Sequence, residues 1–391
     1  MTTPTTGAAV PAPSPGGSAA LLDLVAECSI IVCCGSGGVG KTTTAAVVAL
    51  EGARLGRKTV VVTIDPAKRL ADALGLQGLT DTPSRIDGDW PGELWATMLD
   101  TKSTFDALVV KHASVPDQGE RILTNRFYRN ISGALSGTQE YMAMEKLYSL
   151  HDETDFDLVV VDTPPSRHAL DFLDAPRRLS RFLDHRLFRL LVAPGRGFVK
   201  AVNMAAQTFL RTVSRVVGGE VVDDAVAFFQ AFEGMEEGFR QRAARVNELL
   251  AADGTAFVLV ASPRRDTIDE AHFFAERLHE AGIGVRGLVV NRVHPAFGLA
   301  HQGGRGPSDG SAVAAAATAR RAETLAATPV GALYRNLADF QAVASREHAN
   351  LAGLAEAVAP APVVWVPFLH TDVHDLDGLG DVAAHVFSRR D

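Results

Sequence analysis

The chain has 391 residues, 47% of them hydrophobic and 21% charged, which is enough for one large domain or two small ones with a substantial core. The formal net charge of −8 argues against nucleic acid as a partner. No basic residue precedes Lys41 and no long apolar run is present, so we expect neither a secretory signal nor a transmembrane helix. The three cysteines have no framework spacing, which favours reduced thiols and a cytoplasmic protein.

Short apolar runs alternate with helical patterns along most of the chain. Residues 1–19, rich in Pro, Ala, Thr and Gly, are instead predicted to form a disordered tail. The apolar runs are 29–34, 58–64, 93–99, 156–161, 256–261, 285–290 and 361–366, and helices are predicted over 41–55, 266–281 and 317–355. Runs that are apolar throughout suit strands buried on both faces. The alternation therefore predicts an α/β fold with a doubly wound, mostly parallel sheet.

One interval between the runs contains helical periodicity and no strand pattern. We predict an inserted α-helical subdomain over 176–252, within a sheet domain of 20–175 and 253–391, and expect 117–150 to be helical too. The apolar residues of the insert fall on helical faces. They are Leu179, Phe182, Leu183, Leu187, Leu190 and Leu191, followed by Ala225, Phe228, Phe232, Met235, Phe239, Val246 and Leu250.

The strongest motif is G-x-x-x-x-G-K-T, which follows the first apolar run and opens a helix. Its glycines allow backbone N–H groups to face phosphates, and the helix N-terminus adds partial positive charge. Lys41 is expected to bridge the β- and γ-phosphates of ATP, and the Thr42 hydroxyl to ligate Mg²⁺. The predicted nucleotide-binding residues are Gly35, Ser36, Gly37, Gly38, Val39, Gly40, Lys41, Thr42 and Thr43.

Polar residues also end three later runs. Asp162 ends a strand that should lie beside the motif, where an acid orders Mg²⁺ and its waters. Asp65 ends another and is expected to face the γ-phosphate and orient a water, although taken alone it could equally be a helix N-cap. Asn291 either pairs with the adenine edge or forms a turn, and the sequence alone does not decide between them.

Together these motifs resemble the deviant-Walker P-loop ATPases of the ArsA arsenite-pump and tail-anchored-protein-targeting family. "GSGGVGKTT", "TIDPAKRLADALG", "DTPPSRHALDFL", "VVNR" and "VPFLHTDVHDLDGL" are similar to its P-loop, switch I, switch II, adenine strand and late adenine loop, in that order. The resemblance implies ATP hydrolysis by a dimer with nucleotides at the interface and a helical insert that moves with nucleotide state. It assigns Asp65 to the attacking water and the metal site, Asp162 to Mg²⁺, and Asn291 and Pro367 to the adenine.

The chain departs from this family at Ser36. The family has a signature lysine at that position, which reaches the phosphates of the partner subunit. A serine supplies no such charge, and loss of one electrostatic donor typically costs about 3 kcal/mol of transition-state stabilisation. Because the lysine acts across the interface, we predict a heterodimer with a lysine-bearing paralogue. The alternative is a nucleotide-binding but poorly hydrolysing regulatory or scaffold subunit.

The cysteines also bear on the cargo. Pump-type members bind trivalent arsenic through dispersed cysteines, and targeting members can hold zinc through C-x-x-C; this chain has neither pattern. We therefore expect neither arsenite stimulation nor bound zinc. An apolar helix or a membrane protein is the remaining cargo class, and it requires an apolar groove on the insert. The sequence does not decide this, because core and groove residues look alike.

Overall fold

The computed structural model describes residues 16–65, 69–113, 115–131, 139–164, 175, 181, 219–295 and 309–387. The chain divides into two compact units. Unit 1 consists of Met1–Met98, Thr154–Leu170 and Asp253–Asp391, and unit 2 of Leu99–Glu153 and Asp171–Ala252. No helix in the described ranges combines the length and the apolar character that a membrane crossing needs.

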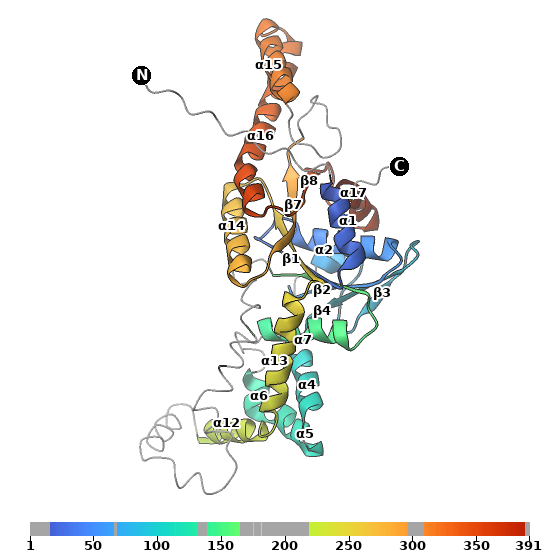
Figure 1. Ribbon diagram of the computed structural model, residues 1–391, viewed down its shortest axis with the longest axis vertical. Coiled ribbons are helices and arrows are strands. Elements are labelled where there is room, and N and C mark those ends of the chain that lie inside the picture. The colour runs from blue at the N-terminus through green and yellow to red at the C-terminus, as the bar shows by residue number, and fades with distance from the viewer. Residues whose placement is uncertain are drawn as a thin grey trace. The chain divides into compact units, whose positions relative to one another are not determined.

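Unit 1 contains a sheet and the helices that cover it (Figure 1). The strands are β1 Ile30–Gly35, β2 Lys58–Thr63, β3 Ser84–Ile86, β4 Glu93–Met98, β5 Leu158–Asp162, β6 Thr255–Ala261, β7 Val285–Val293 and β8 Val363–Pro367. The helices are α1 Gly17–Glu27, α2 Lys41–Arg54, α3 Arg69–Ala73, α14 Arg265–Glu280, α15 Asp309–Thr324, α16 Pro329–Ala357 and α17 Leu376–Val386.

The eight strands form one sheet in the order β3-β4-β2-β5-β1-β6-β7-β8. Every neighbouring pair is parallel except β3 with β4. This confirms the predicted α/β class with a mostly parallel sheet. The antiparallel edge strand β3 was not predicted, because only one of its three residues is buried and it therefore has no apolar run.

The central strands β1, β5 and β6 are buried at every residue. Helices α1, α2 and α17 lie on one side of the sheet, and α14 and part of α16 on the other, as Figure 1 shows. Helices on both faces leave these strands no exposed side. This explains why their sequences are apolar throughout and do not alternate.

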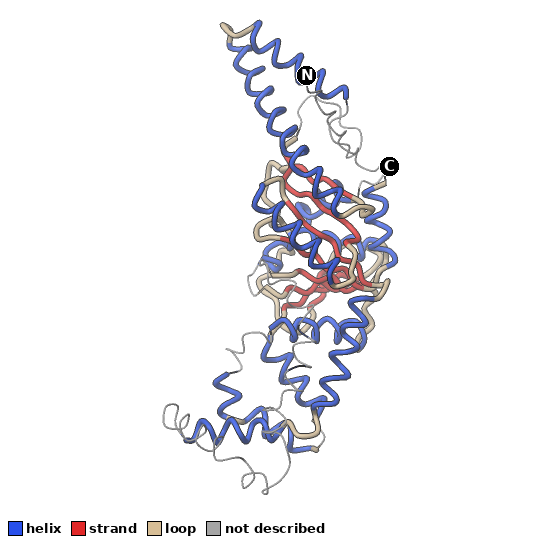
Figure 2. Tube along the Cα trace, turned by 60° about the vertical axis from the view of Figure 1, so that its left-hand side comes forward, coloured by secondary structure: helices blue, strands red, loops and turns tan. Residues whose placement is uncertain are grey.

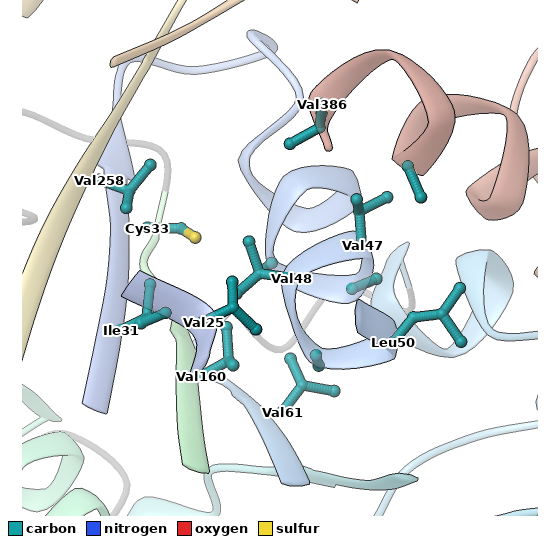
Figure 3. Packing of buried hydrophobic residues seen from close by; sticks show 14 of the residues in the cluster. Val25, Ile31, Cys33, Val47, Val48, Leu50, Val61, Val160, Val258 and Val386 are labelled. Carbon is teal, nitrogen blue, oxygen red and sulfur yellow. The ribbon is translucent and has the colours of Figure 1, made fainter. Parts of the chain in front are cut away.

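Helix α2 is enclosed by the rest of unit 1. Figure 3 shows its Val47 next to Val386 of α17, and its Val48 next to Val25 of α1. Small and β-branched side chains such as Ala46 and Val48 let the helix approach the sheet closely. The tight packing fixes the first turn of α2, which carries the last residues of the glycine-rich motif.

The helix predicted over 317–355 is wrong in one respect, because the structure has two helices there. α15 ends at Thr324 and α16 begins at Pro329, and the two pack against each other as a hairpin (Figure 2). Thr328 caps α16 by accepting a hydrogen bond from the N–H of Gly331 at 3.1 Å. A proline suits the first position of a helix but not its interior, since it lacks an N–H.

Unit 2 is helical throughout its described elements. These are α4 Thr101–His112, α5 Pro116–Thr124, α6 Arg126–Ile131, α7 Gln139–Asp152, α12 Gly219–Ala231 and α13 Glu236–Ala251. Phe228, Phe232 and Phe239 of the predicted apolar face are buried in this unit. The other predicted face, from Leu179 to Leu191, lies outside the described residues, as does most of 176–218.

A buried ion pair joins two helices of unit 2. Arg242 of α13 donates from Nε to both carboxylate oxygens of Glu145 of α7, each at 2.9 Å. Its Nη2 also lies 2.6 Å from a carboxylate oxygen of Glu153. The guanidinium stacks over the ring of Tyr148 at 3.7 Å from the ring centre. Arg242 and Glu145 expose only 6% and 5% of their side chains, so this contact is part of the core.

Candidate phosphate-binding site

The glycine-rich motif connects β1 to α2 at the carboxyl edge of the sheet. Gly35, Gly38 and Gly40 have φ values of 146°, 75° and 98°, which favour glycine. Two of them also leave no room for a side chain. A Cβ at Gly35 would lie 2.1 Å from the carbonyl oxygen of Val260, and one at Gly40 would lie 2.2 Å from Nδ2 of Asn291. A side chain at position 35 would therefore collide with fixed backbone, and one at position 40 would displace the Asn291 amide.

Lys41 is the first residue of α2 and is 5% exposed. Its Nζ donates a hydrogen bond to the carbonyl oxygen of Ser36 at 2.7 Å, so the side chain lies back over the loop. Burial lowers the pKa of Lys41, and the nearby charge of Asp162 opposes that shift. The ammonium group is thus held inside the loop, with a buried carboxylate near it.

Ser36 occupies the position where the resemblance expects a lysine. The residue is 2% exposed, and its Oγ is buried without a hydrogen-bond partner among the described residues. Its side chain therefore faces the interior of this chain. A lysine at this position would have to leave that environment before its charge could reach anything outside.

The carboxylate of Asp162 is the buried acid of the site. Its Oδ2 accepts hydrogen bonds from the hydroxyls of Thr42 at 2.9 Å and Thr63 at 3.0 Å. Its Oδ1 is buried and has no partner among the described residues. Burial raises the pKa of Asp162 to about 6, against the lowering effects of the two hydroxyls and of Lys41. A carboxylate with one unpaired buried oxygen can use that oxygen to bind a cation.

These oxygens fit the Mg²⁺ that the resemblance implies. Hard cations prefer oxygen ligands, and Mg²⁺ usually keeps several waters and takes only one or two protein groups. Asp162 offers its unpaired Oδ1, and the Thr42 hydroxyl oxygen keeps its lone pairs while it donates. No group of three or more His, Cys, Asp or Glu within the described ranges is arranged to hold a metal. The arrangement therefore suits a metal shared with a bound phosphate more than a closed protein site.

Asp65 lies two residues after the end of β2. Its backbone N–H donates to Oγ1 of Thr63 at 3.2 Å, and the same hydroxyl donates to Asp162. One carboxylate oxygen of Asp65 lies 4.0 Å from Nη1 of Arg69, and its side chain is 18% exposed. The charge of Asp65 raises the pKa of Asp162. The two acids thus belong to one electrostatic group at the sheet edge.

Two consecutive side chains at the end of β7 reach the glycine-rich loop. Nδ2 of Asn291 donates to the carbonyl oxygen of Val39 at 2.9 Å, and Nη1 of Arg292 donates to that of Gly38 at 3.1 Å. The N–H of Arg292 donates to Oδ1 of Asn291 at 2.9 Å. Asn291 is a strand residue here, so the alternative of a turn former is wrong. Arg292 has a φ of 61°, a conformation that costs about 1 kcal/mol for a residue with a side chain.

The predicted adenine residues Asn291 and Pro367 end neighbouring strands. Pro367 pairs with Val293 across β7 and β8. Beyond it, the ring of Phe368 lies parallel to that of His294, with centroids 6.2 Å apart. The His294 backbone N–H and its Nδ1 contact the two carboxylate oxygens of Glu347 at 2.8 and 2.6 Å. The contact between His294 and Glu347 thereby connects the end of β7 to α16.

Gly37, Thr43 and the switch II segment complete the predicted set. Gly37 is exposed at the tip of the loop and Thr43 is half-buried in α2. Thr163, directly after Asp162, donates to the carbonyl oxygen of Cys33 at 2.9 Å. The rest of switch II, 165–173, lies outside the described residues.

Sequence reasoning missed two residues of this site. Thr63 supports Asp162 because β2 and β5 are neighbours, and a strand-end threonine in "VVVTID" was its only signal. Arg292 supports the loop, and its signal was the cation directly after Asn291. Both roles depend on strand order, which is not readable from spacing.

All three cysteines are free and buried. Burial raises the pKa of Cys34 to about 12 and that of Cys33 well above its usual range. These thiols therefore stay protonated, whereas a thiolate is the form that binds soft metal ions.

Comparison with known proteins connects this site to a family. The family model of the anion-transporting ATPases, ArsA, matches residues 28–298. A relative named ATPase ASNA1 homolog, from Dictyostelium discoideum, is 25% identical over 260 residues, which cover 66% of this chain and 70% of the relative. ATPase ARSA2 from Chlamydomonas reinhardtii is 28% identical over 266 residues, 66% of each chain. ATPase GET3 from Malassezia globosa is 26% identical over 264 residues, 67% of this chain and 72% of the relative.

The matched region contains the glycine-rich loop, both acids and the end of β7. It covers well over half of the chain, and its relatives are ATPases. The chain therefore belongs to the anion-transporting ATPase family, ArsA, and is an ATP hydrolase.

Proposed function

We propose that this chain is a Mg²⁺-dependent ATPase that acts as one subunit of an asymmetric dimer and couples ATP hydrolysis to movement of its helical unit. The observation that carries the proposal is a contrast within one loop. Thr42 donates a hydrogen bond to the buried Asp162, whose charge acts on the buried Lys41, whereas Ser36 offers no charge. The chain thus has its own phosphate and metal groups but not the cation that serves a partner.

Each residue of the site has a proposed task. The N–H groups of residues 35–43 and the Lys41 ammonium hold the β- and γ-phosphates. Thr42 and Asp162 would hold Mg²⁺, which would supply a positive charge that stabilises the negative charge developing on the phosphate. Asp65 accepts a hydrogen bond from the attacking water and aligns it with the γ-phosphorus. Water adds as the bond to the ADP oxygen breaks, giving ADP and phosphate.

The base is proposed to lie at the ends of β7 and β8, beside Asn291 and Pro367. The amide of Asn291 has one further N–H and one further lone pair to offer, since among the described residues it donates once and accepts once. An amide that can donate one more hydrogen bond and accept one more can pair with an adenine edge.

The dimer and the cargo are proposed from the family to which the chain is similar. Relatives named ASNA1, ARSA2 and GET3 are ATPases by name, and the resemblance to this family implies a dimer. An apolar helix or a membrane protein is the proposed cargo class. The free cysteines fit a reducing compartment, and we propose that the protein works in the cytoplasm.

Lys41→Ala tests the phosphate assignment. We expect Mg-ATP binding, measured by calorimetry, to fall below detection, because the variant removes the only ammonium in the loop. Lys58→Ala is the matched control: Lys58 begins β2 at the opposite edge of the sheet, where it pairs with the exposed Asp155. Unchanged nucleotide affinity in Lys41→Ala would overturn the site assignment, and so would an equal loss in both variants.

A further inference from the structure

The carbonyls of Gly38 and Val39 are both held from β7. The hydrogen bonds of Arg292 and Asn291 to them measure 3.1 and 2.9 Å. Among the described residues, these are the two loop carbonyls that accept hydrogen bonds from side chains of β7. The contact is close: a Cβ on Gly40 would lie 2.2 Å from the Asn291 amide nitrogen.

Holding a carbonyl fixes the N–H on the other side of the same peptide unit. In a trans peptide the C=O and N–H point in opposite directions. The Gly38 carbonyl shares its unit with the N–H of Val39, and the Val39 carbonyl shares its unit with the N–H of Gly40. Pulling both carbonyls toward β7 therefore turns two N–H groups away from β7 and into the loop.

The backbone of β7 is distorted where it provides these donors. Arg292 is the one residue other than glycine with a left-handed φ among the described residues. The register between β7 and β8 shifts between Val290 and Val293, so this residue stands out of the regular ladder. A residue with a side chain persists in a backbone conformation that favours glycine only where the surrounding contacts hold it there, and such residues cluster at functional sites.

Arg292 also brings charge. Its side chain is exposed, and no ion pair joins it to a carboxylate in the described ranges. A guanidinium has five N–H donors and stays charged at any physiological pH, so one donor can hold Gly38 while the positive charge acts on the loop.

We propose that Arg292 is a positioning residue for the nucleotide phosphates: it fixes the Gly38–Val39 peptide so that the Val39 N–H faces them, and it thereby slows nucleotide release. This inference rests on the proposed phosphate site in residues 35–43. It concerns the lifetime of the bound nucleotide and not the hydrolytic step, since Arg292 lies on the β7 side of the loop and Lys41, Asp65 and Asp162 form a separate group.

The test measures dissociation of a fluorescent ADP analogue from the full chain by stopped flow. We expect Arg292→Ala to release it about tenfold faster, the equivalent of about 1.4 kcal/mol. Arg292→Lys keeps a charged donor and should recover part of the slow release. Arg292→Gly removes the left-handed strain together with the donor and should release as fast as the alanine variant.

Arg286→Ala is the matched control, since Arg286 lies on the same strand and donates to the carbonyl oxygen of Asp253 instead. It should release nucleotide at the wild-type rate. Release at the wild-type rate by Arg292→Ala, or equal acceleration by Arg286→Ala, would overturn the inference. Wild-type release by Arg292→Gly would also overturn it, because the backbone and not the guanidinium would then be responsible. If the wild-type chain or its Lys41→Ala variant contradicts the phosphate site itself, the proposed function fails, which is a separate result.

Discussion

At the scale of single residues, the phosphate loop depends on positions where a side chain does not fit. Gly40 and Gly56 have similar left-handed backbones, with φ of 98° and 84°. Their surroundings differ. A Cβ on Gly40 would collide with the Asn291 amide, whereas one on Gly56 would meet nothing within 4 Å. Comparing substitutions at Gly40 and Gly56 therefore distinguishes the effect of backbone strain from the effect of a steric collision.

We expect Gly40→Ala to lose most of its affinity for Mg-ATP, because Asn291 must move and release the Val39 carbonyl. Gly56→Ala should cost about 1 kcal/mol of the free energy of unfolding through strain alone and leave affinity unchanged. Calorimetric titration and urea denaturation of both variants check this. Equal affinity in the two variants would contradict the steric argument.

Asp162 should make the metal-free protein sensitive to pH. Its folded-state pKa of about 6 lies above the ordinary value of 3.8, so the folded chain binds this proton more tightly than the unfolded chain. The stability that this provides is fully present below pH 3.8 and is lost as the pH rises through 6. At pH 7.5 the buried charge therefore lowers the free energy of unfolding.

Asp162→Asn removes that charge while it keeps an acceptor for Thr42 and Thr63. With Mg²⁺ chelated, we expect the variant to be about 3 kcal/mol more stable than wild type at pH 7.5 and to keep only about half of this advantage at pH 5. Asp155→Asn, on an exposed side chain, should change little at either pH. Urea denaturation measures all four values, and a pH-independent difference would count against burial as the cause.

Sequence patterns located part of this residue-level chemistry. Lys41 and Thr42 follow from motif spacing, and Asp162 from its place after a buried strand. The partners of Asp162 and of the loop carbonyls did not follow. Thr63 and Arg292 come from strands whose position in the sheet relative to β1 is a matter of tertiary packing.

At the scale of elements, the described helices of unit 2 depend on a buried charge. Arg242 of α13 is the counter-ion of Glu145 of α7, and both are almost fully enclosed. Removing one partner of such a pair leaves an uncompensated charge in the core. Removing both with apolar groups of similar size avoids that cost.

We expect Arg242→Met to lower the free energy of unfolding of unit 2 by about 3 kcal/mol or more, and the double variant with Glu145→Met to regain most of it. Arg240→Ala on the same helix removes an exposed pair with Glu237 and should stay within about 0.5 kcal/mol of wild type. Chemical denaturation followed by helix content measures the series. A double variant as unstable as Arg242→Met would show that the pair itself is stabilising.

Strands were predictable from the sequence where both of their faces are buried, and less predictable where they are partly exposed. The seven predicted strands are all present. Six agree within two residues at each end and β7 runs three residues further than predicted, because a strand covered on both faces has a continuous apolar run. The edge strand β3 has no such run. The break between α15 and α16 was missed although Thr328 and Pro329 mark it, because the apolar periodicity continues on both sides.

At the scale of the whole molecule, the proposed asymmetric dimer predicts how much the rate of ATP hydrolysis depends on the partner. A homodimer of this chain would have no lysine at position 36 on either side, and the buried Ser36 cannot substitute for one. One electrostatic donor at a transition state is worth about 10²–10³ in rate. A lysine-bearing partner should supply that factor to this chain's site.

We expect the purified chain alone to hydrolyse ATP about 10²-fold more slowly than its mixture with a signature-lysine paralogue. Replacing only the paralogue's signature lysine by alanine should return the mixture to the slow rate. Ser36→Lys is a weaker test, because the new side chain would begin in a buried position. Equal rates for the lone chain and the mixture would end the asymmetric-dimer proposal.

The strand order also has a consequence for synthesis. β1 is made early, yet its neighbours are β5, which begins at Leu158, and β6, which begins at Thr255. While the chain emerges from the ribosome, one edge of this apolar strand lacks its partner until β5 has been made, and the other edge until β6 has been made. Unpaired edges favour aggregation during this period. The loop acquires its Val260, Asn291 and Arg292 contacts later still. Nucleotide capture therefore becomes available only to a nearly finished polypeptide, and ATP would stabilise completed chains in preference to truncated ones.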